Sequence, residues 1–172
     1  MNLTDIQALL GRTPAVLEAE FAGLPESWTG RDAGPATWSA RDVVAHLVQG
    51  EVEDWIPRAR IVLEHGVSRT FAPFDPEGFR ESEAGLTLED LLPRFAQLRL
   101  QNLDWLARET LTEQQLDLCG THPAFGDVTL RQLLWTWAAH DLSHLAQLAR
   151  VLAHPVGDGV GPWREYLPIV RS

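Results

Sequence analysis

Apolar residues recur at helical spacing along most of the chain, and the alternation typical of β-strands is nearly absent. The clearest pattern covers residues 129–153, where Thr129 and Gln132 have the spacing of a capping box. One face of this segment carries the apolar residues Leu130, Leu133, Trp137, Leu148 and Val151. This wide apolar arc predicts a helix that is mostly buried.

Three more helical segments precede it. The first covers residues 4–24 and is interrupted at Pro14. The second runs from a Ser39 N-cap to residue 64, and Pro57 inside it should bend it. The third covers residues 87–110. The pattern predicts an all-α fold, a four-helix bundle with short extra helical turns and a C-terminal tail.

The connections between these helices differ in length. Residues 67–86 form a long loop, which in a compact domain often acts as a lid over a functional site. Another loop reaches Val128, and Trp163 and Tyr166 in the tail are expected to pack back on the bundle. A chain of 172 residues suits one buried core, so we expect a single domain over residues 1–172.

Charge and composition exclude several classes of function. The formal net charge is −10, which opposes binding to nucleic acid or to an acidic membrane surface. All 14 cationic side chains are arginine, so no lysine can form a Schiff base. The chain has no recognisable signal peptide or membrane-spanning stretch, and its single cysteine, Cys119, cannot form an internal disulfide. These features predict a cytoplasmic protein.

His140 and His144 are the strongest candidate site residues. They stand four positions apart on the apolar face of the last helix, so their rings project side by side from adjacent turns. That spacing lets both imidazoles reach one metal ion. The alternative is a pair of core histidines bonded to backbone or water. A metalloprotease reading of His140–His144 is disfavoured because Asp141 stands where the catalytic glutamate belongs.

The pattern of residues along the chain does not by itself identify the third metal ligand. His46 lies near the start of the second long helix, in a polar stripe with Asp42, Gln49 and Glu53. The other histidines, at a helix end or in loops, are His65, His122 and His154. A rigid site is harder to build on loops, but this argument does not by itself select His46.

Three segments resemble motifs of the DinB-like (DinB/YfiT-like) superfamily. Residues 38–48, Trp-Ser-Ala-Arg-Asp-Val-Val-Ala-His-Leu-Val, resemble its second-helix motif. Residues 74–79, Phe-Asp-Pro-Glu-Gly-Phe, are similar to the loop before its third helix. Residues 126–147, which contain His-Asp-Leu-Ser-His, resemble its fourth-helix signature.

This resemblance implies an up-down-down-up bundle, commonly a homodimer, with a three-histidine metal centre at His46, His140 and His144. The usual ions are zinc and nickel. Relatives include S-transferases that use a low-molecular-weight thiol such as mycothiol or bacillithiol, thiol-dependent isomerases, and proteins called metal-dependent hydrolases. The partners expected here are therefore a small-molecule electrophile or a thiol.

Two functions remain open at this stage. In a metal-dependent enzyme, a thiol S-transferase or hydrolase, the ion would activate a thiol or water, and Asp42, Glu53 or Asp141 would orient a ligand histidine or move protons. In a non-catalytic metal-binding stress-response protein, the ion would instead have a structural role and hold the second and fourth helices together.

Overall fold

The computed structural model describes residues 2–32, 34 and 37–171. The long helical segments are α1 (Leu3–Leu10) with α2 (Thr13–Phe21), α4 (Ala40–Glu53) with α5 (Trp55–His65), α7 (Leu88–Glu109) and α9 (Leu130–Ala153). The shorter elements are α3 (Glu26–Thr29), α6 (Phe79–Ser82), α8 (Glu113–Leu116), β1 (Cys119–His122), β2 (Gly126–Thr129), and the 3₁₀ turns η1 (Gly66–Ser68), η2 (His154–Val156), η3 (Gly161–Tyr166) and η4 (Pro168–Val170). No helix in the described ranges is long and apolar enough to cross a membrane.

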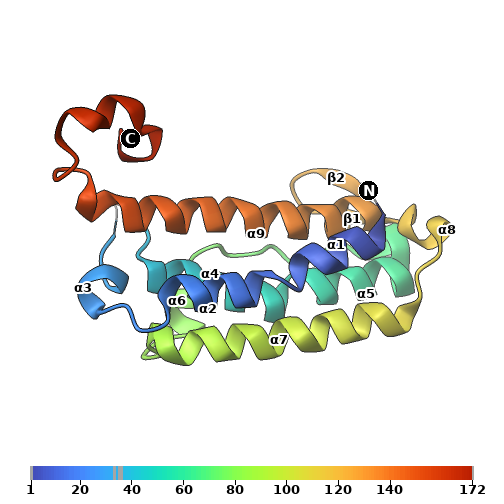
Figure 1. Ribbon diagram of the computed structural model, residues 1–172. Helices are drawn as coiled ribbons and strands as arrows, with labels where there is room; N and C mark the ends of the chain where they lie inside the picture. The colour runs from blue at the N-terminus through green and yellow to red at the C-terminus, as the bar shows by residue number, and fades with distance from the viewer. Residues whose placement is uncertain (1, 33, 35–36, 172) are drawn as a thin grey trace.

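The long segments form the predicted bundle. In Figure 1, α1–α2 and α9 run in one direction, whereas α4–α5 and α7 run in the opposite one. This is the up-down-down-up order that the resemblance implies. The second and third segments are parallel, so the chain has to return along the bundle between α5 and α7, and residues 66–87 make this return.

Capping boxes set where the helices of the bundle begin. The Ser39 hydroxyl accepts a hydrogen bond from the Asp42 backbone N–H, and the Asp42 carboxylate accepts one from the Ser39 N–H. Thr129 and Gln132 form the same reciprocal pair at the start of α9. Fixed starts of this kind set the rotation at which later residues of each helix face the core.

The second segment breaks at Asp54 and not at Pro57, where the sequence predicts a bend. Asp54 has φ −107° and ψ −74°, and α5 begins directly after it. A proline ring clashes with the carbonyl of the residue four positions earlier and leaves it without a donor. For Pro57 that residue is Glu53, so the distortion falls one turn before the proline.

Residues 119–129, which the sequence analysis treats as loop, contain a β-hairpin. Strands β1 and β2 pair antiparallel, with Cys119 opposite Thr129 and His122 opposite Gly126. The segment was missed because each strand has only four residues, too few to show alternation. The hairpin leads directly into α9, and the Leu130 N–H donates to the Leu118 carbonyl.

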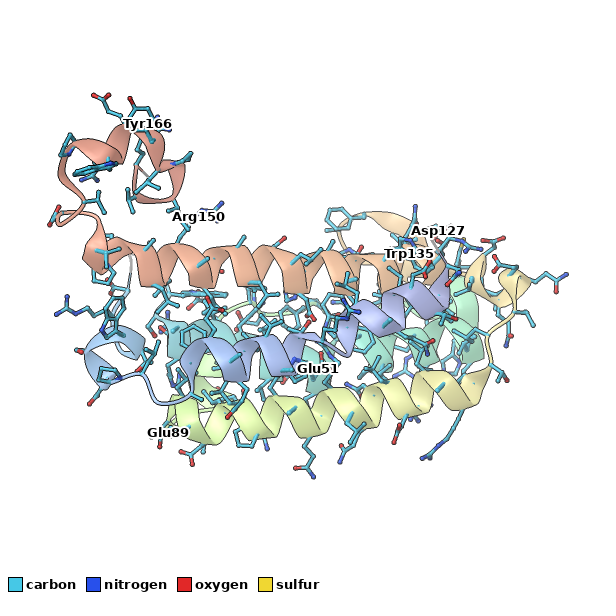
Figure 2. All side chains as sticks on the ribbon, viewed as in Figure 1. Glu51, Glu89, Asp127, Trp135, Arg150 and Tyr166 are labelled. Atoms are coloured by element: carbon cyan, nitrogen blue, oxygen red, sulfur yellow. The ribbon has the colours of Figure 1, made fainter. Side chains whose placement is uncertain are left out.

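The prediction that the tail aromatics pack on the bundle is wrong. Trp163 is 68% exposed and Tyr166 is 79% exposed. The 3₁₀ turns of the tail lie on the outer side of α9 near its C-terminal end, and Figure 2 shows Tyr166 there. The side chain that packs back is Val170, which is buried.

The core has two apolar parts with a polar layer between them. One part contains Leu17, Val48, Phe95 and Leu148, and the other contains Leu10, Trp55, Leu106 and Trp137. Along each long segment, a buried polar residue separates the two parts. These residues are Thr13, Glu51, Arg99 and Asp141.

Arg99 is the centre of this layer. Its guanidinium donates two hydrogen bonds to Asp141, at 2.6 and 2.9 Å, and one to Glu51 at 2.8 Å. It also donates to the Leu10 carbonyl at 2.8 Å. The Trp137 indole and the Asn102 amide donate to Glu51, and the Thr13 hydroxyl donates to Asp141. The network therefore joins α1–α2, α4, α7 and α9, and Figure 2 shows Glu51 inside the bundle.

We expect Arg99→Met to destabilise the fold by about 3–5 kcal/mol, because it leaves two carboxylates buried without their cation. Urea unfolding followed by circular dichroism measures this loss. The matched control is Arg108→Met in the exposed last turn of α7, which should change stability by less than about 0.5 kcal/mol. Equal effects at the two positions would show that the buried network does not stabilise the bundle.

Candidate metal centre

His46 of α4 and His140 and His144 of α9 meet between the two helices. The Nε2 atom of His140 lies 3.1 Å from the Nε2 of His46 and 3.1 Å from the Nε2 of His144. One ligand atom from each residue lies within 4.8 Å of the others. Nitrogens bound at about 2.0–2.1 Å to one tetrahedral ion stand roughly 3.3 Å apart. The spacing of the three nitrogens thus fits a shared ion.

The outer nitrogens of two rings are held by acceptors. The Nδ1 of His46 lies 3.1 Å from the Pro76 carbonyl oxygen, and the Nδ1 of His144 lies 2.8 Å from Oε1 of Gln147. A carbonyl oxygen can only accept, so Nδ1 of His46 carries the proton and its Nε2 presents a lone pair. Pairing of this kind fixes both the tautomer and the orientation of a metal-ligating histidine.

His140 lacks the outer acceptor that the other two rings have. Its Nδ1 is buried and has no hydrogen-bond partner within the described ranges. The edge of its ring meets Trp55, with ring centroids 5.1 Å apart. Its Nε2 faces the two neighbouring Nε2 atoms, and a cation between them would satisfy all three. The chemistry of this donor set fits a divalent metal ion.

Burial keeps the histidines neutral. Desolvation, reinforced by the charge that His144 would carry, lowers the pKa of His46 to about 4. Desolvation and the neighbouring histidines lower the pKa of His140 to about 3. Desolvation also lowers the pKa of His144. All three rings are then neutral at neutral pH, which is the form that binds a metal.

Aromatic side chains surround the cluster. Trp38 stacks nearly parallel to His144 at 6.1 Å and lies 4.8 Å from His46. Phe74, in the connection between α5 and α7, meets His46 edge-on at 5.7 Å. This connection also supplies the Pro76 carbonyl, and Glu77 accepts a hydrogen bond from the Trp38 indole. The expected lid segment thus lies against the histidines.

The carboxylates named as candidates occupy different positions. Asp141 is buried and engaged with Arg99 and Thr13. Asp42 caps α4 and pairs with Arg41 at 3.4 Å. Glu53 accepts from the Gln49 amide at 2.9 Å. In the part of the chain that the structure describes, the candidate ligand group contains three histidines and no carboxylate.

The remaining histidines lie away from this group. His65 ends α5 near Glu64, His122 stacks on Phe125 at the hairpin, and His154 begins η2. Sequence reasoning missed the contributions of Pro76 and Gln147. The sequence could have indicated the Gln147 contact, because Gln147 follows His144 by three positions on the same helix face. The contact of Pro76 with His46 could not be inferred from sequence spacing, because the two residues are far apart in the chain.

Comparison with known proteins identifies the family. The model of the DinB superfamily matches residues 9–148. Among solved structures, the chain is similar to YfiT from Bacillus subtilis, described as a probable metal-dependent hydrolase with an unusual four-helix bundle topology. The two share 22% identity with a TM-score of 0.77, over 90% of this chain and 87% of YfiT. No curated protein matches. The chain belongs to the DinB superfamily.

We expect the purified protein to bind about one divalent ion per chain, because three neutral imidazoles converge on one point. Replacing both His140 and His144 by alanine should abolish binding. Metal analysis by mass spectrometry, with circular dichroism as the folding control, measures this. Full metal content in the double variant would exclude the three-histidine site.

His46→Ala tests whether the site spans two helices. We expect at least a tenfold weaker metal affinity, because only the two ligands of α9 remain. Competition with a chromophoric chelator measures the affinity. His65→Ala and His122→Ala are matched controls outside the cluster and should bind as the native chain does. A loss at His122 equal to that at His46 would mean that the third ligand is assigned incorrectly.

Proposed function

We propose that this member of the DinB superfamily is a metal-dependent enzyme that holds one divalent ion with His46, His140 and His144. The observation that supports the proposal best is the convergence of three Nε2 atoms from two helices. The group includes no carboxylate among the described residues, so three neutral ligands would leave the ion its full charge and at least one position for a small molecule.

Such an ion would lower the pKa of a water or thiol and supply a nucleophile near neutral pH. Zinc and nickel both suit imidazole ligands. YfiT is described as a probable metal-dependent hydrolase, which favours hydrolysis. The resemblance of the motifs to those of thiol-dependent relatives favours a low-molecular-weight thiol as cosubstrate and transfer to an electrophile.

The chain's own residues would prepare the site in separate ways. The Pro76 carbonyl and the Gln147 amide hold two rings with their lone pairs directed at the centre. Trp38 and Phe74 pack against the His46 ring, where they would restrict the access of water. Restricting water strengthens the electrostatic interactions of a charged centre.

The three candidate carboxylates would not act alike. Asp141 is a positioning residue, because both its oxygens are bound by Arg99 and it follows His140 directly in α9. Glu53 is exposed and reaches the loop over the site through Gln49, whose amide also donates to the Asp75 carbonyl. Asp42 lies one turn before His46. Glu53 and Asp42 are therefore the remaining candidates for moving protons in the proposed reaction.

The alternative is that the ion only joins α4 to α9. The position of the ligands on these two helices is compatible with that role. The two functions differ in coordination, because a structural zinc site is closed by four protein ligands.

A cobalt-substituted protein distinguishes the two functions. If the centre is open, adding a small thiol such as 2-mercaptoethanol should produce a sulfur-to-cobalt charge-transfer band. The same protein should accelerate thiol transfer or ester hydrolysis within a panel of electrophiles, and His46→Ala should remove the activity. A spectrum that does not respond to thiol, azide or pH would support the structural role.

A further inference from the structure

Residues 75–78 form a tight turn in the connection that lies against the histidines. The Gly78 N–H donates to the Asp75 carbonyl at 3.1 Å, and the Asp75 carboxylate accepts a hydrogen bond from the Glu77 N–H at 2.9 Å. Aspartate, proline and glycine at the first, second and fourth positions are typical of a type I β-turn. These four residues therefore favour the turn by themselves, and it leads into α6, which packs against α4.

Two neighbouring carbonyls of this turn contact side chains of α4. The Asp75 carbonyl accepts a hydrogen bond from the side-chain amide of Gln49 at 2.9 Å. The Pro76 carbonyl lies 3.1 Å from Nδ1 of His46. Gln49 follows His46 by three positions, so the two side chains are neighbours on the surface of the helix. When Gln49 holds the Asp75 carbonyl, the next carbonyl of the turn is in place to hold the ring of His46.

The amide of Gln49 is buried at a cost to the fold. Gln49 is 2% exposed, and its Oε1 atom is buried without a hydrogen-bond partner in the described part of the chain. Its Nε2 atom donates to the Asp75 carbonyl and to Glu53, each at 2.9 Å. Because a buried acceptor without a donor is destabilising, an apolar side chain would suit this position better for stability alone. The amide is better explained by the position that it gives to the turn.

Gly78 leaves the space that this amide occupies. A Cβ atom on Gly78 would lie 2.5 Å from Nε2 of Gln49, closer than van der Waals contact allows. Backbone freedom does not explain the glycine, because its φ of −58° and ψ of −25° are open to ordinary residues. The glycine therefore permits the close approach of the turn to Gln49.

The same turn also holds an aromatic neighbour of the site. The Glu77 carboxylate accepts a hydrogen bond from the Trp38 indole N–H at 2.8 Å. Trp38 in turn contacts the rings of His46 and His144. The position of this turn therefore bears on two of the three imidazoles.

We propose that Gln49 is a positioning residue of the metal centre, and that Gly78 admits its amide to the turn. Gln49 holds the turn on α4, the turn presents the Pro76 carbonyl to Nδ1 of His46, and this contact leaves the Nε2 lone pair for the ion. The effect on the ion rests on the proposed function, whereas the orientation of His46 does not. Loss of a group that orients a metal-ligating histidine typically lowers metal affinity about 10- to 100-fold.

Gln49→Leu removes the amide and should leave the fold intact. The Asp75 carbonyl keeps its bond from the Gly78 N–H, Glu53 is exposed to solvent, and the buried Oε1 atom is gone. We expect an unchanged midpoint of urea unfolding and about tenfold weaker affinity for Co²⁺, measured by competition with a chromophoric chelator. Gln101→Leu, at an exposed position of α7, is the matched control and should alter neither. A fall in the urea midpoint that accounts for the lost affinity would show a purely structural role and overturn the proposal.

The metal-free chain provides a second measurement. Nitrogen-15 NMR distinguishes the Nδ1–H form of a neutral imidazole from the Nε2–H form. We expect His46 of the native chain to be in the Nδ1–H form, because the hydrogen bond of a ring nitrogen sets where the proton resides. Gln49→Leu should convert a measurable share of His46 to the Nε2–H form. An unchanged His46 signal in this variant would contradict the positioning role.

Gly78→Ala tests the same contact from the side of the turn. Its methyl group should displace the Gln49 amide, with the same change at His46 and about tenfold weaker Co²⁺ affinity. In the Gln49→Leu chain it should have no further effect, because the shorter leucine leaves space for the methyl group. Gly159→Ala is the matched control, because its Cβ would meet only an ordinary contact at 3.5 Å. Additive losses in the double variant would mean that Gly78 acts independently of Gln49, and would exclude the proposed contact.

The two measurements separate this proposal from the proposed function. If the native chain binds no metal but His46 keeps the Nδ1–H form only when Gln49 is present, the proposed function fails and the positioning of His46 stands. If the native chain and both variants bind metal equally, the metal centre stands and the positioning role is excluded.

Discussion

One buried guanidinium connects the two helices that carry the histidines. Arg99 of α7 holds Glu51 of α4 and Asp141 of α9 at 2.8 and 2.6 Å. Glu51 follows His46 by five positions, and Asp141 follows His140 directly. A slip of either helix along its axis would break these ion pairs and would also separate the Nε2 atoms. The ion pairs and the metal centre therefore depend on the same alignment of α4 with α9.

Arg99 remains charged inside the bundle because its two carboxylate partners stabilise the charge by more than burial destabilises it. Desolvation lowers the pKa of Arg99, but Glu51 and Asp141 raise it by more. The two carboxylates and one guanidinium leave a formal charge of −1 in the layer. An apolar layer of the same volume is often more stable, so a buried ion network is better explained by the alignment it specifies than by the stability it adds. The neighbouring negative charge would also favour a divalent cation at the three neutral histidines.

The histidine site joins local and distant parts of the chain. His140 and His144 come from adjacent turns of one helix, while His46 comes from another. The carbonyl of Pro76, in the loop between α5 and α7, fixes the ring of His46. Trp38 stacks on the ring of His144 and also lines a cleft of about 370 Å³ between the end of α9 and the C-terminal tail.

The sequence by itself determined the features that depend on nearby residues. Helical spacing and capping boxes predicted α7 and α9 and the pairing of His140 with His144, because such interactions span three or four positions. His46 was selected by family resemblance and not by pattern. Only the tertiary structure decided that Asp141 pairs with Arg99, that Pro76 holds His46, and that Trp163 stays exposed. Each of these depends on which distant segment lies opposite a residue, and spacing along the chain carries no record of that.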